Sequence, residues 1–244
     1  MDSPLPPSPV TPDRSPTSLA ILFLVIWATA TLAVAALGQQ PSKVQSAITE
    51  MFTWRAFGDA AMLLLFLALF GIAAQLWTDG SLEPLGLPIR LRGARSFLGA
   101  IGLGVLCFVG LEMLLPTLIG LVRPDIVNLH PDVLANTIPD LSTLLMAVLI
   151  TTVAGGLREE LWRVIFLRAF ERVGGDWGLK VGTLIGSVAF GLMHAYQGTI
   201  AIVVTAIFGL TLALRWRARR DLLELVIIHT SFDLCVVLFI YLRR

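Results

Sequence analysis

Four charges fall within six residues of an otherwise apolar stretch, GLREELWRVI at residues 156–165. They are Arg158, Glu159, Glu160 and Arg163. On an α-helix Glu159 and Arg163 are four residues apart and share a face, whereas Glu160 is three residues from Arg163 and lies about 100° further round. One carboxylate can therefore pair with the guanidinium while the other stays free. The alternative is a salt-bridged helix end that protrudes from a membrane.

A stripe of small and aromatic residues ends in a histidine further along the chain, in GTLIGSVAFGLMH at residues 182–194. Gly182, Gly186, Phe190 and His194 recur every four residues, so they share one slowly drifting helical face. The glycines allow a neighbouring helix to come very close. The imidazole is thus aimed along a helix–helix seam, where it serves either as a catalytic group or as a buried hydrogen-bonding residue.

The segment HTSFD places His229 and Asp233 four residues apart, again on one helical face. A carboxylate one turn from an imidazole can fix its tautomer and raise its basicity. The alternative is that the two side chains simply satisfy each other inside an apolar helix.

The three groups lie on segments that are close in sequence, and short connections favour packing between neighbours. An ionisable residue in the hydrocarbon costs about 2.5 to 3.5 kcal/mol on insertion scales, so it indicates function. Carboxylates and imidazoles that converge in a dry cavity can activate a water molecule and stabilise an oxyanion. Two residues fall outside this set: Glu112 is interpreted as a carboxyl that helps the bundle pack, and His130 as solvated in a loop.

The elements that carry these residues are predicted to span a membrane. Of 244 residues, 56% are hydrophobic and 14% charged, and the mean hydropathy is +0.83, which excludes a water-soluble globular domain. A spanning helix needs about 20 mainly apolar residues. The sequence therefore predicts an all-α fold, a polytopic transmembrane helical bundle of about seven spans. The expected spans are 19–38, 57–77, 96–122, 142–170, 178–197, 198–215 and 221–242.

Few residues lie outside these spans. Residues 1–18 are rich in proline and serine and are expected to form a disordered tail. Residues 43–56 have the pattern of a short interfacial amphipathic helix. Cys107 and Cys235 lie in separate apolar spans, so a disulfide framework is not indicated.

Basic residues are distributed unevenly between the two sides of the expected bundle. With seven spans, eleven of the 18 lie on the side of the N-terminus and five on the other. The positive-inside rule then places the N-terminus in the cytoplasm and the C-terminus outside. The eleven are Arg14, Arg90, Arg92, Arg95, Arg168, Arg172, Lys180, Arg215, Arg217, Arg219 and Arg220.

Together, the three motifs resemble those of a family of intramembrane proteases. This is the CPBP family (CAAX protease and bacteriocin-processing, also called Abi), which includes the CAAX prenyl endopeptidases of the Rce1 type. Its members carry Glu-Glu-x-x-x-Arg, then Phe-x-x-x-His, then His-x-x-x-Asn or Asp, each on its own membrane helix. Phe190 to His194 and His229 to Asp233 match the second and third motifs. The resemblance covers roughly residues 140–240 and divides the chain into the tail 1–18, N-terminal transmembrane helices 19–140 and a catalytic core 141–244.

The first motif departs from the family pattern. Counted from Glu159, the arginine arrives one residue early, at Arg163. Anchored on Arg163 instead, the motif puts Arg158 in the place of the first glutamate and Glu159 in that of the second. Glu159 is therefore either the catalytic base or the partner of Arg163, and Glu160 takes the other role.

The resemblance implies an endopeptidase that hydrolyses peptide or membrane-protein substrates with a Glu/His-activated water. Glu159 and Glu160 supply the carboxylates and His194 acts with the base, while His229 and Asp233 bind the oxyanion or a metal. Arg163 and Phe190 support them. Glutamate with His194 and His229 is also a donor set for Zn²⁺, so metal-free and zinc-dependent mechanisms both stay open. No nucleic-acid partner is expected, and the compact loops suggest a bacterial inner (plasma) membrane protein.

Two other function classes remain as alternatives. A non-catalytic relative would keep the helices as an immunity or scaffold membrane protein, with its activity lost through the altered first motif. A proton-coupled transporter would use Glu112, Glu159 and the histidines as a relay, but the paired broken helices of that class are not seen in the sequence.

Overall fold

Helices form all the regular structure in the computed structural model, which describes residues 52–86, 93–123 and 137–243. No strand occurs within these ranges, so the all-α class is confirmed. η2 and η3 are π-helical, and η1 and η4 are short 3₁₀ turns. The elements are α3 (Trp54–Asp79), η1 (Glu83–Leu85), α4 (Ala94–Cys107), η2 (Phe108–Leu114), α5 (Leu115–Val122), α7 (Leu141–Ile150), η3 (Thr151–Glu159), α8 (Glu160–Met193), η4 (Ala195–Gln197), α9 (Thr199–Arg219) and α10 (Leu222–Leu242).

The described chain contains five stretches that are long and apolar enough to cross a membrane. The prediction of seven spans is not confirmed, because the described residues contain five such stretches; the expected spans 142–170 and 178–197 correspond largely to the two arms of one of them, Leu141–Met193, which bends at Gly174 and Gly175. The expected first span, 19–38, lies outside the described residues, as do the tail 1–18, His130 and residues 43–51. The five stretches are Trp54–Ala73, Ala94–Val122, Leu141–Met193, Thr199–Arg219 and Leu222–Leu242.

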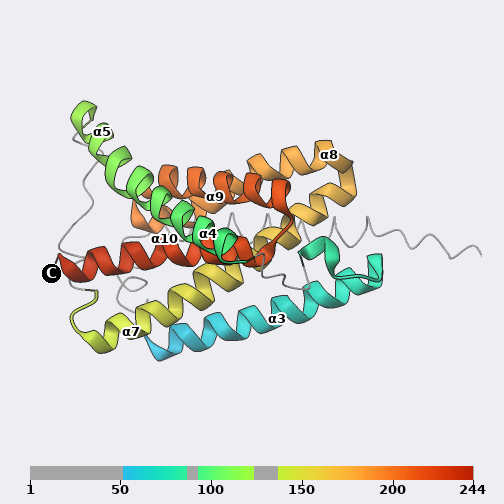
Figure 1. Ribbon diagram of the computed structural model, residues 1–244, viewed down its shortest axis with the longest axis horizontal. Coiled ribbons are helices and arrows are strands. Elements are labelled where there is room, and N and C mark those ends of the chain that lie inside the picture. The colour runs from blue at the N-terminus through green and yellow to red at the C-terminus, as the bar shows by residue number, and fades with distance from the viewer. Residues whose placement is uncertain (1–51, 87–92, 124–136, 244) are drawn as a thin grey trace, which may run out of the picture.

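The long helix α8 is folded back on itself. Gly174 and Gly175 leave helical geometry, and Gly175 has a φ of 58°, a conformation that residues with a side chain rarely adopt. A Cβ atom on Gly182 would lie 2.7 Å from the Phe170 ring, and one on Gly186 would lie 2.8 Å from the ring of Phe166. These contacts pair the two arms of α8 in antiparallel fashion, and Figure 1 shows the turn between them. The predicted glycine stripe is therefore a packing seam.

Ion pairs tie the hairpin turn to the end of α9. Glu171 accepts hydrogen bonds from Arg220 at 2.6 and 2.8 Å and from Arg168 at 2.5 Å. Arg220 also stacks on the ring of Trp216, at 4.1 Å from its guanidinium carbon to the ring centroid. The fold-back of α8 is thus fixed against the turn that leads into α10.

Helix α10 runs through the middle of the bundle. It contacts α4, η3, α7, α8 and α9, and Figure 1 shows α3 and α7 on one side of it and α9 on the other. Gly104 of α4 lies against the α10 backbone, because a Cβ there would meet the carbonyl oxygen of Ile228. By contrast, the outer surface is apolar, with Phe66 of α3 63% exposed and Leu184 of α8 61% exposed. Such a surface suits an integral membrane protein, whose outer side chains face lipid.

Candidate active site

Glu160 is fully buried at the start of the α8 helix and binds two cationic or polar partners at once. Arg163 donates from Nε at 2.9 Å and from Nη2 at 3.2 Å to its two carboxylate oxygens. His229 Nδ1 lies 2.6 Å from Oε1 of Glu160, which links α8 to α10. Because a carboxylate accepts, Nδ1 of His229 carries the proton in this contact.

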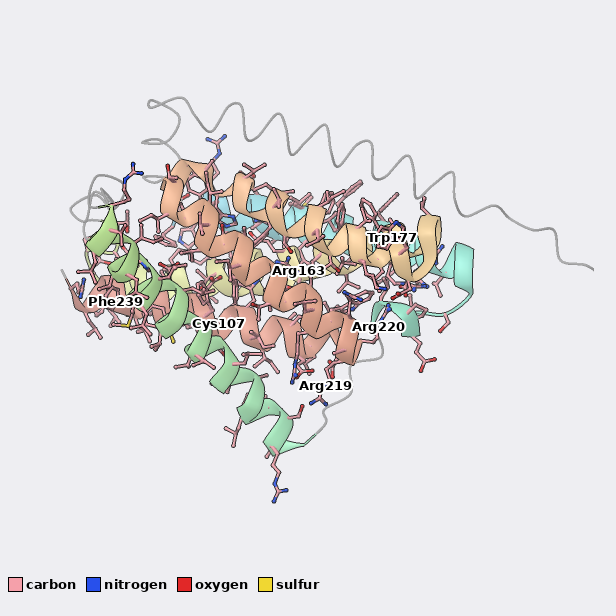
Figure 2. The ribbon with its side chains drawn as sticks, turned by 90° about the horizontal axis from the view of Figure 1, so that it is seen from above. Cys107, Arg163, Trp177, Arg219, Arg220 and Phe239 are labelled. Carbon is pink, nitrogen blue, oxygen red and sulfur yellow. The ribbon has the colours of Figure 1, made fainter. Side chains whose placement is uncertain are left out.

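The guanidinium of Arg163 is enclosed on its remaining sides. Its Nη1 donates to the carbonyl oxygen of Gly209 on α9 at 3.3 Å, and its guanidinium carbon lies 4.4 Å from the centroid of the Phe190 ring. Figure 2 shows Arg163 in the interior of the bundle, with Trp177 and Arg220 at one end. Along α8, Glu160 precedes Glu171 by about 16 Å at 1.5 Å per residue. This distance along α8 from the charged turn is about half the thickness of a hydrocarbon core of roughly 30 Å.

The shortened first motif keeps its ion pair. In the family pattern the second glutamate is four residues before the arginine, whereas Glu160 is three residues before Arg163. Both spacings put the two side chains on one face of a helix. Within the described residues, Arg163 forms its ion pair with Glu160, and Glu159 forms its ion pair with Arg158. The alternative in which Glu159 is the partner of Arg163 is therefore not the pairing that the structure has.

Glu159 lies next to His229 on the more open side of the site. Its Oε2 is 3.9 Å from Nε2 of His229, and its Oε1 accepts a hydrogen bond from Nη2 of Arg158 at 3.1 Å. Asp233 approaches the same imidazole nitrogen, with Oδ2 at 3.7 Å. Both distances exceed a direct hydrogen bond and are within reach of one bridging water. Nε2 of His229 therefore faces two carboxylates.

His194 contacts the ring of Phe190, which also lies near His229. It lies at the C-terminus of α8, and its Nδ1 donates to the carbonyl oxygen of Phe190 at 2.8 Å. The Phe190 ring centroid is 4.8 Å from that of His194 and 6.0 Å from that of His229. In the part of the chain described, no hydrogen bond or ion pair joins His194 to the carboxylates. Among the described residues, polar contacts thus join Glu159, Glu160, Arg163, His229 and Asp233, whereas His194 is linked to this group through its contact with the Phe190 ring.

The placed side chains do not form a metal-binding set. Among the described residues, no group of three or more His, Cys, Asp or Glu side chains is arranged to hold a metal ion. Nδ1 of His229 is bound to Glu160, and both carboxylate oxygens of Glu160 accept hydrogen bonds from Arg163, so these atoms already have partners. This arrangement does not fit the zinc set of a glutamate with both histidines, so no metal enters the chemistry derived below.

A π-helix and two glycines bring α10 close to the glutamates, a feature that the spacing of polar residues did not indicate. A Cβ on Gly155 would collide with Oδ2 of Asp233, and one on Gly156 with Oγ1 of Thr230. The wider η3 coil ends at Glu159, and such coils are frequent at functional sites. The glycine pair before the charged stretch was the available signal for this close approach. Threonine hydroxyls of Thr151 and Thr152 bond the preceding carbonyls, which a membrane interior requires.

Two further polar groups border the cluster. Tyr196 of η4 stacks on His194 with 6.2 Å between ring centroids, accepts a hydrogen bond from Gln197, and interacts electrostatically with Glu159 and Asp233. Burial raises the pKa of Tyr196, so its phenol stays protonated and can donate. Glu112 of η2 also interacts electrostatically with Asp233, which places it nearer the site than its isolated position in the sequence indicated.

Comparison with known proteins gives one family. Residues 140–235 match the family model described as type II CAAX prenyl endopeptidase Rce1-like. The match covers α7 to α9 and most of α10, including all three motifs, and agrees with the resemblance drawn from those motifs. No curated protein and no solved structure matches the chain.

Proposed function

We propose that this chain, whose residues 140–235 form an Rce1-like domain of a protease family, is an intramembrane endopeptidase. The observation that supports this most is the buried cluster of charged side chains, which the proposal places near the middle of the membrane. There the buried Glu160–Arg163 pair fixes His229, and the Nε2 atom of His229 faces Glu159 and Asp233. A buried ion pair contributes little net stability, whereas it can hold reacting groups in one geometry.

Glu159 acts as the general base in the proposed reaction. A water between Oε2 of Glu159 and Nε2 of His229 would be within hydrogen-bond reach of both atoms, which are 3.9 Å apart. Glu159 takes a proton as the water oxygen bonds to the scissile carbonyl carbon. When the carbon–nitrogen bond breaks, the same proton passes from Glu159 to the leaving amine.

His229 and Asp233 stabilise the oxyanion that forms in this step. With both ring nitrogens protonated, His229 keeps its Nδ1–H on Glu160 and donates its Nε2–H to the oxyanion. Asp233 stands beside the same nitrogen and orients it. The Nδ1–H of His194 is bound to the carbonyl oxygen of Phe190, and we assign its Nε2 to proton transfer or substrate binding beside the Phe190 ring.

The substrates are peptides or membrane proteins that reach the site within the bilayer. We propose that the protein lies in a bacterial inner membrane, as its compact loops suggest, with its N-terminus in the cytoplasm, the side that the unequal distribution of basic residues favours.

Turnover of a peptide library by the full chain in liposomes tests the function. Wild-type protein should cleave members of the library, and Glu159→Gln should lower the rate by about 10²- to 10⁴-fold, the usual contribution of a general base. The thermal unfolding midpoint should stay within a few degrees of wild type, because Glu159 is partly exposed and does not neutralise Arg163. Glu83→Gln, at the exposed turn η1, is a matched control that should keep full activity.

Absence of cleavage by folded wild-type protein would instead favour the non-catalytic scaffold alternative. Full activity of Glu159→Gln would remove this residue from the role of base.

A further inference from the structure

Arg158 differs from the other arginine of the cluster in how it is bound. Arg163 is 6% exposed and is held by Glu160, Gly209 and Phe190. The Arg158 side chain is 27% exposed, and its one hydrogen bond to a described residue is the donation from Nη2 to Glu159. A guanidinium has five N–H donors in a fork that matches a carboxylate. Arg158 therefore has donors available for a second anion.

The position of Arg158 is at the open edge of the proposed active site. Side-chain exposure falls from 27% at Arg158 and 23% at Glu159 to 4% at His229 and 0% at Glu160. Tyr196 interacts electrostatically with both Arg158 and Glu159, so the η4 turn borders the same edge. A substrate that approaches Glu159 from the exposed side meets Arg158 first.

Glu159 connects Arg158 to the reacting atoms. Its Oε1 is bound by Arg158, and its Oε2 faces His229. A carboxylate on the substrate would otherwise approach Glu159, Glu160 and Asp233, three acidic groups in a medium that screens charge poorly. The guanidinium of the adjacent Arg158 offsets the repulsion between the substrate carboxylate and these acidic groups. Because one residue of extended chain spans about 3.3 to 3.6 Å, an anion bound there lies within about two residues of the scissile bond.

We propose that Arg158 is a specificity-determining residue that binds a substrate carboxylate within about two residues of the scissile bond. The inference rests on the proposed protease function. When the substrate anion binds Arg158, the anion competes with Glu159 for the guanidinium. Oε1 of Glu159 is then freed as the substrate arrives. The carboxylate belongs either to an acidic side chain or to a free C-terminus, two sources with the same chemistry.

Paired peptides test this preference on the full chain in liposomes. A cleaved library peptide is prepared with Glu or Gln at each position within two residues of the scissile bond, with its C-terminus amidated. A second pair places the C-terminus two residues after that bond as a free acid or an amide. A charged hydrogen bond contributes about 1.5 to 3 kcal/mol, so wild type should favour one acid over its neutral twin by about 10- to 100-fold in kcat/KM.

The variants separate recognition from a structural role. Arg158→Gln should bring the acid-to-neutral ratio close to one, Arg158→Lys should retain part of it, and Lys180→Gln, exposed at the hairpin turn, should leave it unchanged. The pair that loses its preference identifies the source of the carboxylate. Equal kcat/KM for all twins with wild type, or an unchanged ratio in Arg158→Gln, overturns the proposal while the protease function stands.

Binding measurements decide the case in which no peptide is cleaved, which would count against the protease function itself. Fluorescence anisotropy of the labelled acid and neutral peptides then reports the preference without turnover. Tighter binding of the acids to wild type than to Arg158→Gln supports the role of Arg158, and equal binding of acid and neutral twins overturns it.

Discussion

At the scale of single residues, the two adjacent glutamates occupy different environments and should respond differently to the same substitution. Glu160 is fully buried between Arg163 and His229, whereas Glu159 is 23% exposed beside Arg158. Glu160→Gln leaves the buried guanidinium without a charge partner, which costs about 3 to 5 kcal/mol. We expect a clear fall in the thermal unfolding midpoint, measured in detergent micelles.

The matched variant for this measurement is Glu159→Gln, which changes the neighbouring position by the same atoms. It should keep a midpoint close to wild type while losing activity. Similar midpoints for both variants would mean that Arg163 does not depend on Glu160 for its charge compensation.

A second prediction at this scale concerns metal ions. The proposed base works without a metal, because Glu160 is already bound to Arg163 and to Nδ1 of His229. We expect peptide cleavage to persist after dialysis against a strong zinc chelator, followed by assay in metal-free buffer. Loss of cleavage that returns on addition of Zn²⁺ would show that the side chains rearrange around a metal.

Much of the candidate site follows from spacing, because i to i+3 and i to i+4 positions share a helical face. That rule anticipated the approach of Asp233 to His229 and a glutamate partner for Arg163. It left open which glutamate pairs, since both lie within one turn of the arginine. The place of His194 beside Phe190 depends on where α8 ends, and that end is set by tertiary packing.

At the scale of elements, the π-helix η3 determines how near α10 comes to the glutamates. Gly155 contacts Asp233, and an added methyl group there would overlap its carboxylate. We expect Gly155→Ala to destabilise the protein by about 1 to 3 kcal/mol, as overpacking does, and to lower the cleavage rate by displacing Asp233. Thermal unfolding and peptide turnover measure the two effects.

Gly102 of α4 provides the matched control for this substitution. A Cβ there meets nothing within 4 Å, so Gly102→Ala should be neutral or gain up to about 1 kcal/mol from helix propensity. A Gly155→Ala protein as stable and active as Gly102→Ala would show that α10 can move away from η3 at no cost.

The extent of the helices was easier to predict than their geometry. Apolar length placed helices close to the expected residues 57–77, 96–122 and 221–242. It could not reveal η2 or η3, because apolar runs have the same hydropathy in α- and π-helical form. The predicted break between residues 170 and 178 contains the Gly174–Gly175 turn, where α8 folds back on itself.

At the scale of the whole molecule, we expect the charged end of the bundle to determine the orientation in the membrane. The ion pairs of Glu171 with Arg168 and Arg220 gather at the hairpin turn of α8 and the end of α9. Figure 2 shows Arg219, Arg220 and Trp177 at this same end. The positive-inside rule assigns the end with excess Lys and Arg to the cytoplasm. Helix α10 then carries the chain from this side to the other.

Cysteine labelling in intact cells tests this orientation, in a background with Cys107 and Cys235 replaced by alanine. Ala218→Cys, exposed at the end of α9, should resist a membrane-impermeant maleimide until the cells are opened. Arg243→Cys, exposed just after α10, should react from outside without opening, because a single spanning helix separates the two positions. The reverse pattern would place the basic end outside and overturn the topology. Labelling of both positions in intact cells would mean that α10 does not cross the membrane, and the depth assigned to Glu160 and His229 would then have to be abandoned.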